Sequence, residues 1–156
     1  MQPLTLVAAI ALAACSTAGT HTAEVMSRAV PDGSGRLCVL REKQTIYSFL
    51  RVEISVDGRA IGTLRSGNYL ATDLPPGAHG LTVAALISRS TADFDLTPAK
   101  TTYVDVAMTP SGLSPPRGAI GAAPAYPITA EAGLFSIHFL EGREAAAKLA
   151  DLAPSD

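Results

Sequence analysis

The sequence contains no tryptophan and only four tyrosines and four phenylalanines among its 156 residues. This supply of aromatic rings is poor for a platform that would stack sugars or nucleic-acid bases. Acidic and basic side chains nearly balance, at 14 and 12, so no excess of positive charge favours nucleic acid as a partner. Hydrophobic residues make up 47% of the chain, which is too high for a disordered protein and predicts one packed domain at this length.

The common sequence signatures of catalysis are also missing. The chain has no Gly-x-Ser-x-Gly nucleophile elbow, no phosphate-binding glycine loop and no His-Glu-x-x-His helix. Its three histidines are far apart and show no zinc-ligand spacing with either cysteine. Asp93 and Asp95 offer two carboxylates, but calcium takes six or more oxygen ligands. We therefore expect a protein that is not an enzyme and that uses no metal or other cofactor.

The N-terminus carries an uncharged, mostly aliphatic run from Leu4 to Ala14. This run is shorter than the roughly 20 residues of a membrane-spanning helix, and it suits the core of a signal peptide. It ends in Leu12-Ala13-Ala14-Cys15, where small residues precede a cysteine as in a lipoprotein cleavage site. We expect residues 1–14 to be removed and Cys15 to be lipidated. The alternative is a buried apolar helix with an incidental cysteine.

In these residues the chain resembles bacterial lipoproteins, in which the cysteine becomes the mature N-terminus and carries two or three acyl chains. Two chains suffice for stable anchoring, because each buried CH₂ group contributes about 0.8 kcal/mol. The resemblance implies a periplasmic protein that reaches the membrane through acyl chains on Cys15. Ser16, which follows the cysteine, implies the outer membrane.

Residues 16–35 are rich in Ser, Thr, Ala and Gly and end in the turn-forming sequence Pro31-Asp32-Gly33-Ser34-Gly35. We expect residues 15–35 to form a flexible tether, in which residues 23–30 are too few for a helix that is stable alone. If Cys15 is acylated, Cys38 has no disulfide partner. We expect Cys38 to be a small buried residue of a strand.

The pattern from Arg36 onward is typical of β-strands. The run Leu37–Arg41 predicts a buried strand, the polar residues 42–48 predict a loop, and Val52–Val56 alternates apolar with polar residues. Asp57-Gly58 then predicts a type I′ hairpin turn, and Pro75-Pro76-Gly77 a type II turn. Further strands are expected at residues 59–64, 69–74, 79–87, 91–97, 102–108 and 134–140. Short strands at this spacing indicate a sandwich or a barrel.

Several of these turn and strand segments resemble a domain-of-unknown-function family of small Gram-negative lipoproteins. They are also similar to the PEGA-type β-sandwich repeats of surface proteins. The resemblance covers about residues 36–108 and the final strand, and it implies a single antiparallel β-sandwich without any particular chemistry. In the family, glycine often stands where this chain has Ala99. The segments that carry the resemblance are Leu40-Arg41, Val56-Asp57-Gly58, Gly62-Thr63-Leu64, Leu74–Leu81 and Lys100–Val104.

Residues 109–133 are dominated by Pro, Gly and Ala. A loop of this length is uncommon within a compact domain and is usually functional or disordered. We favour a disordered insertion. The alternative is a contact loop, in which Arg117, Tyr126 and Ile128 are the candidate binding residues.

A single short helix is expected near the C-terminus, at residues 141–152, with an ion pair between Glu144 and Lys148. Ala145, Leu149 and Leu152 would line its packed side, and Pro154 would end it.

Taken together, the sequence predicts an all-β protein with three parts: a signal peptide at 1–14, a tether at 15–35, and a β-sandwich with a short C-terminal helix at 36–153. For function it predicts a lipid-anchored module on the periplasmic face of the outer membrane. Its partner would be an envelope protein or peptidoglycan, contacted through unpaired sheet edges or the 109–133 loop. A glycan- or peptidoglycan-binding domain is the alternative, and nucleic acid is not expected.

Overall fold

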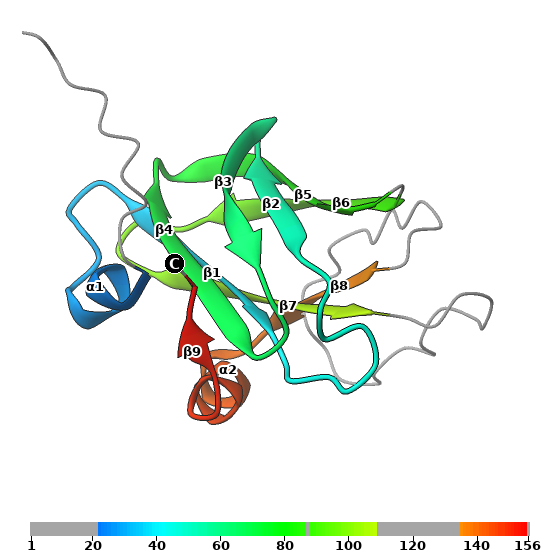
Figure 1. Ribbon diagram of the computed structural model, residues 1–156. Coiled ribbons are helices and arrows are strands. Elements are labelled where there is room, and N and C mark those ends of the chain that lie inside the picture. Colours follow the sequence, from blue (N-terminus) through cyan, green and yellow to red (C-terminus); the bar gives the residue numbers. More distant parts are fainter. Residues whose placement is uncertain (1–21, 87, 109–134, 156) are drawn as a thin grey trace, which may run out of the picture.

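The computed structural model describes residues 22–86, 88–108 and 135–155 of the chain (Figure 1). These residues form two β-sheets that pack face to face, together with two short helices. The predicted all-β sandwich is therefore confirmed. None of the helices within these ranges is long and apolar enough to cross a membrane.

The larger sheet has five strands and the smaller has four. In spatial order, the five-stranded sheet contains β8 (Phe135–Leu140), β7 (Thr101–Met108), β1 (Gly35–Arg41), β4 (Asn68–Leu74) and β9 (Ala153–Pro154). The four-stranded sheet contains β3 (Arg59–Leu64), β2 (Val52–Val56), β5 (Gly77–Ala85) and β6 (Ser88–Leu96). The helices α1 (Thr22–Ser27) and α2 (Gly142–Leu149) lie on the side of the five-stranded sheet that faces away from the other sheet (Figure 1).

Strand β1 is buried along its whole length. Leu37 and Val39 point between the two sheets and belong to the main hydrophobic core. Cys38 and Leu40 alternate with them, so they point toward the helices, and they too are fully buried. A strand covered on both faces needs apolar residues at successive positions. This explains the uninterrupted apolar run in the sequence.

The core between the sheets is aliphatic, with two phenylalanines. It is supplied by every second residue of the central strands, as the alternation in the sequence predicts. The two phenylalanines are Phe94 and Phe135. Besides Leu37 and Val39, the fully buried members include Val52, Ile54, Leu64, Leu81, Val83, Val104 and Val106.

The larger sheet differs in one respect from the expected antiparallel arrangement. Strand β1 pairs antiparallel with β4 but parallel with β7, where Val39 lies opposite Val104. Parallel neighbours need a long connection, and here that connection contains strands β2 to β6. Apolar alternation indicates which face of a strand is buried. It carries no information on the direction of the neighbouring strand.

The predicted turns have the backbone that their residues favour. Asp57 and Gly58 have φ of 51° and 76°, so the pair has the two positive φ angles of a type I′ hairpin. Gly77 takes the positive φ of the Pro75-Pro76-Gly77 turn, at 126°. Ala99, in the turn between β6 and β7, also has a positive φ, at 59°. Unlike the other two turns, this one has an alanine in a backbone conformation that favours glycine.

The C-terminal helix is shorter than expected. It ends at Leu149, and Pro154 pairs with Tyr69 as part of the two-residue strand β9. Ala145 is buried against the sheet, as predicted. Lys148 does not pair with Glu144 but reaches Asp105 of β7 and Glu42.

Replacing Ala99 by glycine should stabilise the fold. A residue other than glycine in the left-handed region costs about 1–2 kcal/mol, and glycine removes this cost. Part of the gain is lost because glycine gives the unfolded chain more conformational entropy. We expect Ala99→Gly to raise the free energy of unfolding by about 0.5–1 kcal/mol in urea titrations. The matched control is Ala60→Gly, in exposed strand β3 with no positive φ, which should lower it by a similar amount. Destabilisation by both variants would contradict the argument.

Candidate functional site

The residues that the sequence singled out for function lie outside the part of the chain that the structure describes. They are Cys15 in the N-terminal region, and Arg117, Tyr126 and Ile128 in the 109–133 segment. The structure does describe the residues that follow the predicted lipidation site, from Thr22 onward.

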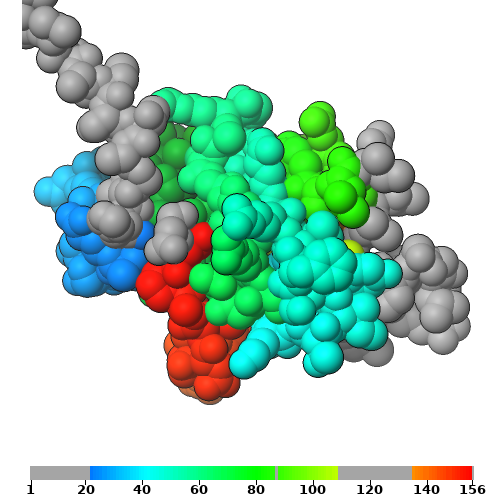
Figure 2. Space-filling view, in the orientation of Figure 1, coloured from blue at the N-terminus to red at the C-terminus, as the bar shows by residue number. Residues whose placement is uncertain are grey.

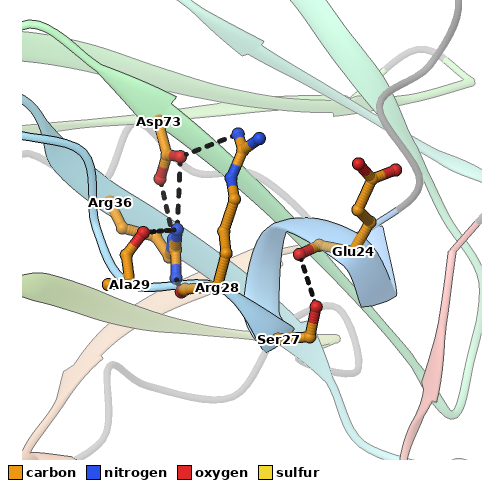
Figure 3. Close-up of polar contacts among 6 residues, drawn as sticks. All are labelled: Glu24, Ser27, Arg28, Ala29, Arg36 and Asp73. Carbon is orange, nitrogen blue, oxygen red and sulfur yellow. Dashed lines mark hydrogen bonds and ion pairs between the residues drawn. The ribbon is translucent and has the colours of Figure 1, made fainter.

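This segment departs from the expected flexible tether, because helix α1 packs on the sandwich through Thr22 and Val25. Helix α1 lies against β4, and the side chain of Val25 is only 1% exposed. Ser27 Oγ donates a hydrogen bond to the carbonyl oxygen of Glu24 at 2.8 Å within the helix (Figure 3). A six-residue helix is marginal alone. It forms here because tertiary packing supplies the stability that local propensity does not.

Two arginines and one aspartate connect this segment to the sheet (Figure 3). Arg36 Nε donates to Asp73 Oδ1 at 2.7 Å and Arg36 Nη2 to Asp73 Oδ2 at 3.2 Å, which is a two-pronged contact. Arg36 Nη1 also donates to the carbonyl oxygen of Arg28 at 2.8 Å, and Arg28 Nη2 reaches Asp73 Oδ2 at 3.1 Å. Arg36 therefore holds β4 and the N-terminal segment at once. We call Val25, Arg28, Arg36 and Asp73 the attachment cluster.

The electrostatics of the attachment cluster favour the ionised carboxylate. Burial by itself would raise the pKa of Asp73, but the hydrogen bonds and charges of Arg36 and then Arg28 outweigh it and leave the pKa below its ordinary value. The two arginines differ in exposure, since the Arg36 side chain is 4% exposed and that of Arg28 is 47% exposed. Most of the energy of the cluster should therefore come from Arg36.

A second polar group joins the β2–β3 hairpin to β5. His79 Nδ1 lies 2.7 Å from Asp57 Oδ2, and His79 Nε2 lies 2.8 Å from the carbonyl oxygen of Pro75. The other Asp57 oxygen accepts the backbone N–H of Gly80 at 2.8 Å. Both ring nitrogens face acceptors, so the charged imidazolium with two donors fits this geometry best. His79 therefore packs between the Asp57-Gly58 turn and the turn at Pro75.

The same contacts shift the protonation equilibria. The hydrogen bond to Asp57 raises the pKa of His79 above its ordinary value, against a smaller opposing effect of burial. The hydrogen bond from the Gly80 backbone, followed by that from His79, lowers the pKa of Asp57. A histidine with both nitrogens engaged is poorly placed to act as a general base.

A third polar group lies where α2 meets β7. Lys148 Nζ lies 2.7 Å from Asp105 Oδ2 and 3.2 Å from Glu42 Oε1. Burial is the main influence on Asp105 and raises the pKa of its carboxyl group, although Lys148 opposes the shift. Lys148, with Glu42, Lys43, Asp151 and Leu152, also lines an open depression of about 580 Å³. Lys148 therefore holds α2 against β7.

Cys38 is an inert thiol in this structure. It is fully buried, and burial raises the pKa of the thiol to about 12, with only a partial opposing effect from Arg36. The burial of Cys38 confirms the small buried strand residue that the sequence predicts. Among the residues that the structure places, no group of three or more His, Cys, Asp or Glu side chains is arranged to hold a metal ion.

No family model, curated protein or solved structure matches the chain. The resemblance to small lipoproteins and PEGA-type repeats therefore stays a prediction from the sequence.

Removing the buried arginine of the attachment cluster should cost much more than removing the exposed one. Arg36→Gln leaves Asp73 and the carbonyl oxygen of Arg28 without their donors, and we expect a loss of about 2–4 kcal/mol in the free energy of unfolding. Arg28→Gln, at the exposed position, should cost less than about 1 kcal/mol. Urea titration of both variants checks this ordering. Equal losses would show that Arg36 does not hold the segment.

The contact between His79 and Asp57 should make stability depend on pH near neutrality. The folded-state pKa of His79 is raised. Its stabilising effect is therefore fully present below the unfolded pKa of about 6.5 and is lost as pH rises through the higher folded value. Melting temperatures of the wild type and of His79→Gln should differ more at pH 5.5 than at pH 9. A difference that stays constant over this range would contradict the assignment.

Proposed function

We propose that this protein is a lipid-anchored module of the bacterial envelope that acts by binding rather than by catalysis. Acyl chains on Cys15 would hold it on the periplasmic face of the outer membrane. The sequence Leu12-Ala13-Ala14-Cys15 motivates the anchor. The attachment cluster supports this proposal, because it holds the N-terminal segment, from Thr22 onward, against the sandwich.

The attachment cluster changes how far the domain would stand from the membrane. With α1 packed from Thr22, only residues 16–21 separate Cys15 from the folded domain. Such a segment spans at most about 25 Å even when fully extended. The proposed anchor would therefore hold the sandwich close to the bilayer.

The polar contacts support binding over catalysis. His79, Asp105 and Lys148, which have shifted pKa values, are each engaged in contacts that join one element of the fold to another. A catalytic site usually keeps at least one such group free to reach a substrate, whereas Lys148, which lines the open depression, is paired with Asp105 and Glu42.

A glycan- or peptidoglycan-binding role is the second candidate. The rings of Tyr47 and Phe49 are exposed, with centroids 6.4 Å apart, and exposed rings are surfaces on which sugars stack. Sedimentation with purified peptidoglycan distinguishes this candidate from a module that binds other partners. Retention of the wild type and loss of retention in Phe49→Ser would favour it.

Mass spectrometry of the mature N-terminus tests the anchor directly. We expect the protein from the membrane fraction to begin at Cys15 and to carry diacylglycerol and a further acyl chain. The Cys15→Ala variant should remain unprocessed and lack these masses. Recovery of an unmodified wild-type chain that begins at Met1, in the soluble fraction, would refute the proposal.

A further inference from the structure

The large apolar side chains that are exposed in the described part of the chain gather at one end of the sandwich. They are Ile46, Tyr47, Phe49 and Leu86, and their exposed fractions are 70%, 46%, 81% and 84%. Single exposed apolar residues are ordinary, but a group of four at one end calls for a physical reason. We call these four residues the apolar end.

The strand order explains why two loops contribute to it. Residues 42–51 follow the last residue of β1, at the end of that strand remote from α1. Glu53 pairs with Ala84, so the start of β2 lies beside the turn between β5 and β6, which contains Leu86. Figure 1 shows the 42–51 loop and the β5–β6 turn on the side opposite α1, and Figure 2 shows their surfaces next to each other.

A buried arginine holds the larger of the two loops in place. Arg41 is fully buried, and its Nη1 and Nη2 atoms donate to the carbonyl oxygens of Leu50 at 2.7 Å and Tyr47 at 3.1 Å. The backbone of the loop also closes on itself, since Leu50 N–H donates to Tyr47 O at 3.1 Å. The loop therefore presents Ile46 and Phe49 from a fixed backbone.

The backbone at this end is strained as well as fixed. Tyr47 and Leu86 have φ of 60° and 54°, a region that large side chains rarely adopt and that costs about 1–2 kcal/mol. Strain of this kind is retained mostly where a local geometry is needed for function. Tyr47 and Leu86, two of the four residues of the apolar end, have this strained backbone.

Two basic residues lie next to the apolar end. Arg51 belongs to the same loop and is exposed, and Arg89 is exposed next to the β5–β6 turn, where it pairs with Ala84. The acidic residues nearest along the chain are Glu42, which is paired with Lys148, and Glu53 of β2. Protruding apolar and aromatic tips with flanking cations are the chemistry of an interfacial membrane contact.

We propose that the apolar end inserts into the interface of a bilayer that contains anionic phospholipids. Ile46, Tyr47, Phe49 and Leu86 would enter the boundary between headgroups and acyl chains, and the flanking cations would contact lipid phosphates. A second protein fits less well, because four side chains are far fewer than the roughly 20–30 residues a side of a stable interface. A bilayer accepts protruding tips without needing a matching shape. This contact goes beyond the proposed anchor, since it does not require Cys15.

A single-tryptophan reporter tests the insertion, because the chain has no tryptophan of its own. Phe49→Trp is made in the full chain with Cys15→Ala, which removes the acylation site. Emission should shift to shorter wavelength on addition of phosphatidylglycerol-containing vesicles. The matched control is Arg59→Trp, at the β2–β3 hairpin of the opposite end, which should not shift even if the N-terminal run binds the vesicle. Equal shifts at both positions, or none at residue 49, would overturn the proposal.

A second set of variants separates the apolar and charged contributions, with Leu86→Trp as the reporter in the Cys15→Ala chain. Adding Ile46→Ser and Phe49→Ser should raise the vesicle concentration at half-maximal shift at least about tenfold. Arg51→Ser should raise it about fivefold for anionic vesicles alone, and Arg59→Ser should leave it unchanged. A reporter shift that appears without lipid as protein concentration rises would assign this end to a second copy of the chain and overturn the proposal. These readouts do not depend on whether Cys15 is acylated.

Discussion

The complete burial of β1 is the constraint on which the rest of this structure depends. Leu37 and Val39 fill the space between the sheets, while Cys38 and Leu40 are covered on the opposite side, where α1 and α2 lie (Figure 1). A strand with both faces and both edges occupied can present polar side chains only near its ends. There the chain places arginines, Arg36 near the start and Arg41 at the end, and each one organises the surface beside it. Arg36 gathers the N-terminal segment, and Arg41 fixes the loop that carries Tyr47.

Burying a charged guanidinium costs free energy, and the two arginines offset this cost in different ways. Arg36 has a carboxylate, Asp73, which offsets the cost of burying its charge. Arg41 makes no ion pair with any residue that the structure describes, and it relies on two backbone carbonyl oxygens and a contact of 3.6 Å with Met108 Sδ. Its Nε atom is buried and has no hydrogen-bond partner among the described residues, and burial lowers the pKa of this guanidinium. If the 47–50 backbone moved away, the buried guanidinium would lose these acceptors, which costs free energy. The charge of Arg41 therefore holds the 47–50 backbone in its position.

Much of the fold could be predicted because its signals are local. The alternation in β2 and the Asp57-Gly58 pair depend on neighbouring residues alone, and both were confirmed. The packing of α1, the parallel pairing of β1 with β7 and the partners of Lys148 depend on residues far along the chain, so the sequence pattern could not reveal them. For the candidate sites, Cys15 was named from a motif, whereas the apolar end was missed. Its signal was present, because Ile46, Tyr47 and Phe49 interrupt a stretch that was otherwise polar.

The central position of β1 also determines how the domain would respond to tension. A load applied to the N-terminal segment passes through Arg36 and runs along the axis of β1. That strand is hydrogen-bonded to β4 on one side and to β7 on the other. The strand would be sheared lengthwise, so both ladders must rupture together, whereas an edge hairpin unzips one bond at a time. A protein attached through this end would therefore resist a pull along this direction.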